Sequence, residues 1–208
     1  LDCDSITALR SQSSFISSPV TIRTMLPILW PPLNYPTMPI RIGDLATDKR
    51  RADEVLDNLV SILRDSITNN YSIGFLASDS DASLRDFWAN EMQRPNNLII
   101  CAWDENEIVG TVIITRESRT NGLHRGEFRK LLVHSNNQRM GIGTSLEAYA
   151  CESARNMGLN LLYLDSATDY LVEKTYEDWG WQRVGSIPKY AAEPSGNLVA
   201  TTIFYKEL

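Results

Sequence analysis

Apolar residues in the first half of the chain recur at intervals of three and four, as they do along one face of an amphipathic helix. One helix is expected to be capped near Asp48, with the apolar positions Ala52, Val55, Leu56, Leu59, Leu63 and Ile67. A second is expected to be capped by Asp81 and to end at Pro95, with the apolar positions Leu84, Phe87, Trp88 and Met92. Both stripes predict helices that pack one face on a core.

The same spacing predicts two more helices in the second half of the chain. One runs from about residue 141 to 157 and ends at Gly158, with the stripe Ile142, Leu146, Tyr149, Ala150, Ser153 and Met157. The other covers about residues 169–179 and stops at Gly180.

Short runs rich in β-branched and aromatic residues predict strands over residues 39–42, 97–103, 108–115, 125–133, 161–164 and 199–205. The polar residues 104–107 between two of these runs are typical of a hairpin turn. The order is a strand, two helices, an antiparallel meander, a βαβ unit and a terminal hairpin. It predicts an α/β (α+β) fold, in which helices flank a mixed, mostly antiparallel sheet.

Residues 1–37 differ in composition from the rest. No acidic residue lies between Ser5 and Gly43, and a serine cluster is followed by a proline-rich stretch. We expect a poorly ordered amino-terminal extension that packs only through Leu29, Trp30 and Tyr35, and one domain over residues 38–208. A serine-rich, acid-poor segment is also what a transit peptide resembles, so organelle targeting stays open beside a cytoplasmic location.

The composition narrows the function classes. The chain has 208 residues, of which 43% are hydrophobic, and a formal net charge of −6. An acidic protein is a poor candidate for binding nucleic acid, which needs a concentrated basic surface, whereas a negative field attracts amines. No apolar run approaches the roughly 20 residues of a membrane span. We expect neither a nucleic-acid nor a membrane partner. The sequence leaves open whether the protein forms a homodimer.

Metal and thiol chemistry find little support in the sequence. Cys3, Cys101 and Cys151 are scattered along the chain. Neither Cys101 nor Cys151 has a His or Asp partner nearby in sequence, so a cysteine nucleophile is not favoured. His124 and His134 are the only histidines, so no metal site is expected.

The stretch from Leu131 to Thr144 carries the clearest chemical signal. A hydrophobic strand runs into a polar loop, and Gly141 and Gly143 then open an amphipathic helix. The first N–H groups of a helix have no intrahelical partner, and glycines let a diphosphate approach them closely. Arg139 adds a planar donor fork suited to phosphate oxygens. The pattern predicts an anion site, although an ordinary loop and helix start would look similar.

A dinucleotide-binding fold is the main alternative for this stretch. Asp165 follows the glycines by about twenty residues and ends an apolar strand, as a ribose-binding acid would. Against it, Leu146 occupies the third glycine position, and the βαβ unit comes late, behind an antiparallel meander.

The residues resemble those of the GNAT superfamily of N-acetyltransferases. Gln138-Arg139-Met140-Gly141-Ile142-Gly143 is similar to its Q/R-x-x-G-x-G/A element. Residues 127–133 look like its fourth strand, and residues 176–181 look like its Y-x-x-x-G-F/W element. Residues 185–191 and 201–206 resemble the corresponding segments of tabtoxin-resistance acetyltransferases. Many relatives carry Asn seven residues before the tyrosine, where this chain has Asp169.

The resemblance implies a GNAT fold, with a sheet that splays between its fourth and fifth strands and holds acetyl-CoA there as co-substrate. The cofactor would lie on the main chain of Leu131, Leu132 and Val133 and on the loop and helix start formed by Gln138, Arg139, Met140, Gly141, Ile142, Gly143 and Thr144. Glu127 fits a general base, with Asp165 in reserve, and Tyr176 lies where the family places its general acid. Alternatively, Glu127 only pairs with Arg125 or Arg129, and Tyr176 only packs on the sheet.

The expected reaction is direct acetyl transfer to the primary amine of a small molecule, a metabolite or a toxin. Trp179, Trp181 and Tyr190 favour a covered aromatic pocket for such an acceptor. Acetylation of a protein amine and a non-catalytic acyl-CoA-binding module are the alternatives.

Overall fold

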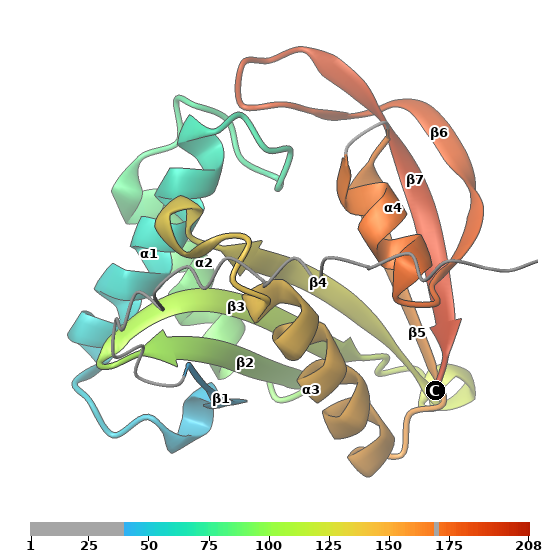
Figure 1. The fold of residues 1–208 in the computed structure, drawn as a ribbon, viewed down its shortest axis with the longest axis horizontal. Helices are drawn as coiled ribbons and strands as arrows, with labels where there is room; N and C mark the ends of the chain where they lie inside the picture. Colours follow the sequence, from blue (N-terminus) through green and yellow to red (C-terminus); the bar gives the residue numbers. More distant parts are fainter. Residues whose placement is uncertain (1–39, 169–170) are drawn as a thin grey trace, which may run out of the picture. The chain divides into compact units, whose positions relative to one another are not determined.

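The computed structural model describes residues 40–168 and 171–208. In these residues one seven-stranded sheet has the strand order β1-β2-β3-β4-β5-β7-β6 (Figure 1). The strands are β1 (Arg41–Asp44), β2 (Asn97–Asp104), β3 (Glu107–Arg116), β4 (Arg125–Val133), β5 (Leu161–Ala167), β6 (Gln182–Ala192) and β7 (Leu198–Glu207). The helices are α1 (Ala52–Thr68), α2 (Asp81–Gln93), α3 (Ile142–Asn156) and α4 (Leu171–Asp178), with short 3₁₀ turns at Leu45–Thr47, Thr120–Gly122 and Ser135–Asn137.

The helices cover the two faces of the sheet in pairs. On one face, α1 and α2 pack on β2 and β3 around a core that includes Leu59, Leu63, Leu84, Trp88 and Ile113. On the other face, α3 and α4 pack around Phe128, Leu146, Leu162, Tyr176 and Phe204. The predicted mixed sheet flanked by helices is thus confirmed.

Strand pairing is antiparallel throughout the sheet except between β4 and β5. This parallel pair is short, with Arg125 opposite Leu161, Gly126 opposite Leu162 and Glu127 opposite Tyr163. Beyond Glu127 the two strands have no further register, so the sheet splays there as expected. A mostly antiparallel sheet also excludes the doubly wound parallel sheet of the dinucleotide alternative.

A bulge interrupts β4 immediately after the splay begins. Its pairing with β3 passes from Ile113 opposite Arg129 to Thr111 opposite Leu132, which leaves an extra residue on β4. Lys130 lies in this bulge with a φ of 55°, in the left-handed region that non-glycine residues rarely adopt.

The predicted elements agree closely with the observed ones, except that β6 of the terminal hairpin had no predicted range; the other differences concern element ends. Arg51, without a side-chain cap, precedes α1, so Asp48 is not its cap. Ser80, one residue before the expected Asp81, caps α2 through its hydroxyl. Two expected core positions, Met92 and Tyr149, are each 40% exposed, because they lie at the edges of their apolar stripes.

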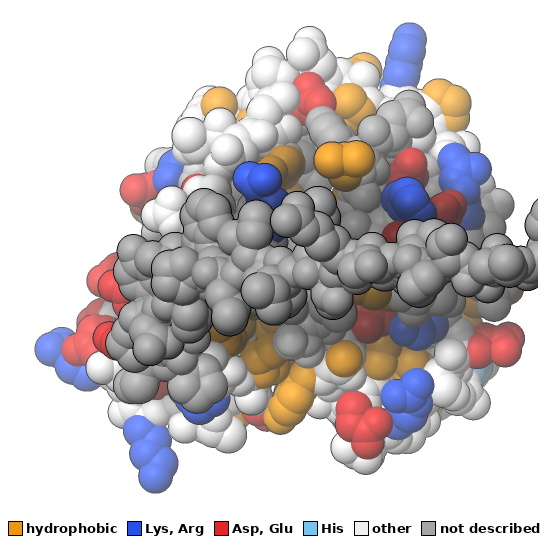
Figure 2. All heavy atoms as spheres, in the orientation of Figure 1, with side chains coloured by type: hydrophobic (Ala, Val, Ile, Leu, Met, Phe, Trp, Pro, Cys, Tyr) orange, Lys and Arg blue, Asp and Glu red, His pale blue; other side chains and the backbone are white. Residues whose placement is uncertain are grey.

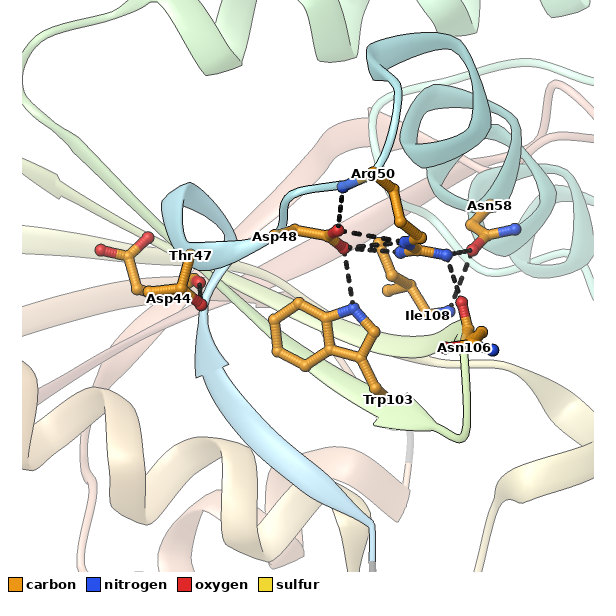
Figure 3. A network of polar contacts seen from close by, with 8 residues as sticks. All are labelled: Asp44, Thr47, Asp48, Arg50, Asn58, Trp103, Asn106 and Ile108. Carbon is orange, nitrogen blue, oxygen red and sulfur yellow. Dashed lines mark hydrogen bonds and ion pairs between the residues drawn. The ribbon is translucent and has the colours of Figure 1, made fainter.

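Asp48 instead organises a polar network at the entry to α1 (Figure 3). Its carboxylate accepts hydrogen bonds from the Arg50 guanidinium at 2.6 Å and from Trp103 Nε1 at 3.0 Å. Arg50 also donates to Asn58 of α1 and to the carbonyl of Asn106 in the β2–β3 turn. The network thereby fastens the first helix to the first hairpin.

The predicted extension and its packing residues Trp30 and Tyr35 lie outside the described residues, as does Asp169. Among the helices that are described, none is long and apolar enough to cross a membrane. On the face shown in Figure 2, the described acidic and basic side chains are interspersed and form no patch of one sign.

Candidate active site

At the start of α3, several consecutive main-chain N–H groups have no hydrogen-bond acceptor among the described residues. Gly141 precedes the helix with a φ of 80°, which glycine adopts without strain, and no side chain caps it. The first hydrogen bond across this turn runs from Ser145 N to Gly141 O. Within the described residues, the N–H groups of residues 139–144 donate to no recorded acceptor. Together with the helix dipole they form a site suited to an anion.

Gly143 has no internal packing reason to be glycine. A Cβ at Gly110 would lie 3.0 Å from the Leu146 side chain, so that glycine is required by close packing. A Cβ at Gly143 would meet only the Trp179 ring at 3.8 Å, an ordinary contact distance. Among the described residues, none is close enough to require glycine at this position, so the bare backbone leaves room for a ligand.

The edge of β4 that faces β5 is open beyond the splay. The main chain of Leu132 and Val133 pairs with β3, Leu131 lies next to Lys130 in the bulge, and none of the three pairs with β5. Gln138 donates from Nε2 to the carbonyl of Val133 at 3.1 Å, which fixes the loop against this strand. Arg139 and Met140 follow with exposed side chains, and Arg139 has a φ of 61°. The open edge thus leads directly to the donors of α3.

Tyr176 lies on the α3 and α4 face of the splay. It is 7% exposed and packs edge-on against Phe128 and Trp181. Its hydroxyl forms no hydrogen bond to any residue that the structure describes. Burial first, and the charge of Asp165 second, raise the pKa of Tyr176 well above its usual value, so the phenol stays protonated and can donate.

Glu127 lies on the opposite face, toward α2. Its Oε2 is 3.7 Å from Nε of Arg129, and its side chain is 34% exposed. Glu127 and Tyr163 line a cleft of about 260 Å³, which Arg94, Arg116 and Glu117 also border. Glu127 therefore reaches solvent in a concave site at the point where β4 and β5 part. The ion pair with Arg129, which was the alternative role for Glu127, is also present.

Asp165 shares this face. One buried residue, Leu164, separates it from Tyr163 on β5, and the side chains of Tyr163 and Asp165 are both exposed. Its charge acts on Tyr176 and also on Lys130 of β4. Asp165 is thus placed near the opening from the β5 side, as Glu127 is from the β4 side.

The expected aromatic pocket is not formed by the three residues named for it. Trp181 is 3% exposed and belongs to the core, where its Nε1 donates to Glu147 at 3.0 Å. Trp179 lies beside Gly143, on the face opposite Glu127, and Tyr190 is 56% exposed. Aromatic rings on the Glu127 face include Tyr163, which lines the cleft with Glu127, and also Phe75 and Phe87, whose rings stand edge-on at 5.2 Å. Nothing in the local sequence linked them to the site.

Hydrogen bonds form a bridge between two loops that are distant in sequence. The α1–α2 loop is joined to the β6–β7 hairpin through Ala77 N and Pro194 O at 3.0 Å, and through Ser72 Oγ and Ala192 O at 3.1 Å. The Asn70 side chain accepts from Ser195 N and donates to Glu193, both at 3.1 Å. Figure 1 shows the two loops side by side. The residues come from distant segments, so sequence spacing gave no sign of this bridge.

The larger cleft in the described residues, of about 600 Å³, lies elsewhere. It is bordered by α1, α2 and His134 and contains none of the candidate catalytic residues. No group of three or more His, Cys, Asp or Glu side chains in the described ranges is arranged to hold a metal ion.

Comparisons with known proteins agree with this arrangement. The profile of the Acetyltransferase (GNAT) family matches residues 61–181. A ribosomal-protein-alanine N-acetyltransferase from Brucella melitensis is similar in fold, with 22% identity, a TM-score of 0.65, and coverage of 76% of this chain and 98% of that one.

Two other solved structures are similar to the same extent. The yncA protein of Salmonella typhimurium, solved with its cofactor acetyl-CoA, has 13% identity, a TM-score of 0.65, and coverage of 82% of this chain and 94% of that one. An aminoglycoside 6'-acetyltransferase type Ii has 22% identity, a TM-score of 0.61, and coverage of 80% and 96%. From the family match and the splayed sheet together, we conclude that the chain belongs to the GNAT family of acetyltransferases.

Proposed function

We propose that this acetyltransferase uses acetyl-CoA to acetylate the primary amine of a small molecule by direct transfer. The observation that supports the proposal is that a tyrosine and a glutamate, the two candidates for proton transfer, lie on opposite faces of the β4–β5 splay. Tyr176 lies on the α3 and α4 face of the β4–β5 splay, and Glu127 lies on the face toward α2. A donor on one side and a base on the other match a reaction in which a thiol leaves and an amine attacks.

The residues around the splay fit acetyl-CoA. The unused N–H groups of residues 139–144 and the guanidinium of Arg139 suit its diphosphate, and Gly143 leaves room for it. The free edge of Leu131 to Val133 can pair with the amides of an extended pantetheine arm. When bound, acetyl-CoA supplies the activated acetyl group. A main-chain N–H at this edge would stabilise negative charge on the carbonyl oxygen.

Proton transfer is assigned to three side chains. An amine is mostly protonated at neutral pH, and only its neutral form attacks, so a carboxylate must accept a proton directly or through water. Glu127 is the proposed acceptor, with Asp165 in reserve on the neighbouring strand. Tyr176 is the proposed donor to the departing thiolate, because its phenol stays protonated and makes no hydrogen bond to a residue that the structure describes.

The cysteines support direct transfer over a covalent enzyme intermediate. Cys101 and Cys151 are both buried. Burial raises the pKa of Cys151 to about 12, and burial also raises that of Cys101. Neither is a thiolate at neutral pH, and a thiol is a poor nucleophile.

A small acceptor is supported by the bridge between the α1–α2 loop and the β6–β7 hairpin. The bridge ties the two loops together, and we infer that it restricts the approach of a folded protein more than that of a small amine. The resemblance of residues 185–206 to tabtoxin-resistance acetyltransferases favours an amino-acid-like toxin or metabolite.

The test is release of free CoA thiol when the protein is given acetyl-CoA and a panel of small amines. We expect amine-dependent thiol release, with the acetylated amine found by mass spectrometry and no acetylated protein. The variants Cys101→Ala and Cys151→Ala should retain turnover. Thiol release that requires no amine, or that is lost with either cysteine, would contradict direct transfer.

A further inference from the structure

Lys130 places a cation beside the opening on the Glu127 face. It lies in the β4 bulge, three residues after Glu127, and its side chain extends toward the α1–α2 loop. Its Nζ donates to the carbonyl of Ile73 at 2.6 Å and stands 5.8 Å and 5.5 Å from the ring centres of Phe75 and Phe87. A Cβ at Gly74 would lie 3.6 Å from Nζ, so the loop leaves space next to the ammonium.

The cation has no anionic partner within contact distance. Within the described residues, no carboxylate oxygen lies within 4.0 Å of Lys130 Nζ, in contrast to Lys206, which contacts Glu147 at 2.7 Å. An ammonium has three donors, and among the described residues only the carbonyl of Ile73 accepts from this one. A partly buried charge without a counter-ion is costly, and burial accordingly lowers the pKa of Lys130. An anion bound from outside would relieve this cost.

Three carboxylates lie near enough to Lys130 for their charges to act on it. Glu127 pairs with Tyr163, so the strands have parted where Lys130 follows on β4 and Asp165 follows on β5. The charges of Asp165, Glu127 and Glu91 act favourably on Lys130, while that of Arg129 opposes it. Glu91 is buried and bound by Arg129, whereas Glu127 and Asp165 are accessible. The opening thus has accessible negative charge at its strand edges and positive charge under the loop.

We propose that Lys130 binds an anionic group of the acceptor. The acceptor is then a zwitterion. Its amine faces Glu127 and Asp165, and its carboxylate or similar acid faces Lys130. This inference rests on the proposed function and narrows it to amines of the amino-acid class. Lys130 then selects among amines, while the proton transfers stay with Glu127 and Tyr176. The Ile73 carbonyl and the two phenylalanine rings hold the ammonium in place.

Matched pairs of acceptors test the inference. L-lysine is compared with cadaverine, and L-phenylalanine with phenethylamine, since each pair differs by one carboxylate. The wild-type protein should prefer the amino acid in kcat/KM. Lys130→Met keeps the length of the side chain and removes the charge, and should reduce that preference by about 10- to 100-fold through KM, as expected for a hydrogen bond to a charged group. Lys49→Met, which removes an exposed lysine far from the opening, should leave the preference unchanged.

A merely structural Lys130 gives a different result. If the lysine only fastened Ile73, Lys130→Met would lower kcat/KM equally for both members of each pair, and that outcome overturns the inference. So does a wild-type protein that prefers the decarboxylated amines.

Binding measurements separate this inference from the proposed function. Calorimetric titration of the CoA complex with N-acetyl-L-phenylalanine and with N-acetylphenethylamine requires no turnover. Tighter binding of the acid, lost in Lys130→Met, supports the anion site even if no amine is acetylated. Equal binding of both compounds to the wild-type protein overturns the site even if acetylation is observed.

Discussion

The carboxylate of Glu127 lies 3.7 Å from the guanidinium of Arg129, measured from Oε2 to Nε. Arg129 is itself held by Glu91 of α2, and its Nε also donates to Thr115 Oγ1 at 3.0 Å. The proposed base therefore stands next to a cation that is fixed from two sides. This contact restrains Glu127 and leaves part of its carboxylate open to the cleft.

Replacing Glu127 tests its role as the base. Glu127→Gln keeps the size of the side chain but cannot accept the proton, so turnover should fall about 100-fold near pH 7, within the range of a single general base. Activity should recover partly at high pH, where the free amine no longer needs a base. The measurement is kcat/KM as a function of pH, with Asp165→Asn in parallel. If only the Asp165 variant shows this recovery, the base is Asp165.

Tyr176 is tested by removal of its hydroxyl. Tyr176→Phe should lower kcat by roughly 10- to 1,000-fold, because the leaving thiolate loses its proton donor. Since the hydroxyl has no hydrogen bond within the described residues, thermal stability and acetyl-CoA affinity should change little. Tyr190→Phe is the matched control, because Tyr190 is 56% exposed. Unchanged turnover in Tyr176→Phe would show that Tyr176 only packs in the core and does not donate a proton.

Gly143 separates cofactor binding from stability. A Cβ at Gly143 fits against Trp179, and alanine is a better helix former than glycine by up to about 1 kcal/mol, so Gly143→Ala should not lower stability. The same Cβ should obstruct the diphosphate and weaken acetyl-CoA binding, and Gly143→Asp should weaken it more strongly by adding negative charge. Calorimetric titration and thermal unfolding measure the two effects. Undiminished acetyl-CoA affinity in the Asp variant would contradict the assigned anion site.

The network around Asp48 makes a prediction for acid stability. Its hydrogen bonds from Arg50 chiefly lower the pKa of Asp48 from 3.8 to about 2. Because the folded pKa is below the unfolded one, the carboxylate stabilises the fold above pH 4, and this contribution is lost as the pH falls toward 2.

Asp48→Asn should therefore destabilise the protein at pH 7 by about 1–3 kcal/mol and flatten the decline in stability between about pH 4 and pH 2. Urea unfolding at several pH values measures this. Asp53→Asn, at an exposed ion pair, should change stability by less than about 1 kcal/mol. An equal effect of both substitutions would show that the Asp48 network is not a stabilising feature.

The spacing of apolar residues predicted the helices and most strands correctly, because each of these elements packs one apolar face on the core. The strand predicted over residues 125–133 has the same bounds in the structure, since polar loops flank a continuous run. The first residue of α2 was harder to locate, because Ser80 and Asp81 are both good caps, and Arg64 binds the Asp81 side chain instead.

The candidate site was only partly visible in the sequence. Gly141, Gly143 and Tyr176 belong to local motifs, so a linear pattern contains them. The contact between Arg129 and Glu91 joins residues 38 positions apart, and the Asn70–Ser195 contact of the bridge joins residues 125 apart. Trp181 was misassigned because an aromatic residue next to a glycine turn looks the same whether it enters the core or lines a pocket. Its hydrogen bond to Glu147 decides the matter in the structure.

The size of the acceptor is the most direct test of the account. The measurement is kcat/KM for acetyl transfer to free amines and amino acids, compared with peptides that carry a lysine or a free amino terminus. We predict that at least one small amine is preferred over every peptide by tenfold or more. A peptide preferred by tenfold over every small amine would contradict the proposed acceptor and leave the family assignment intact.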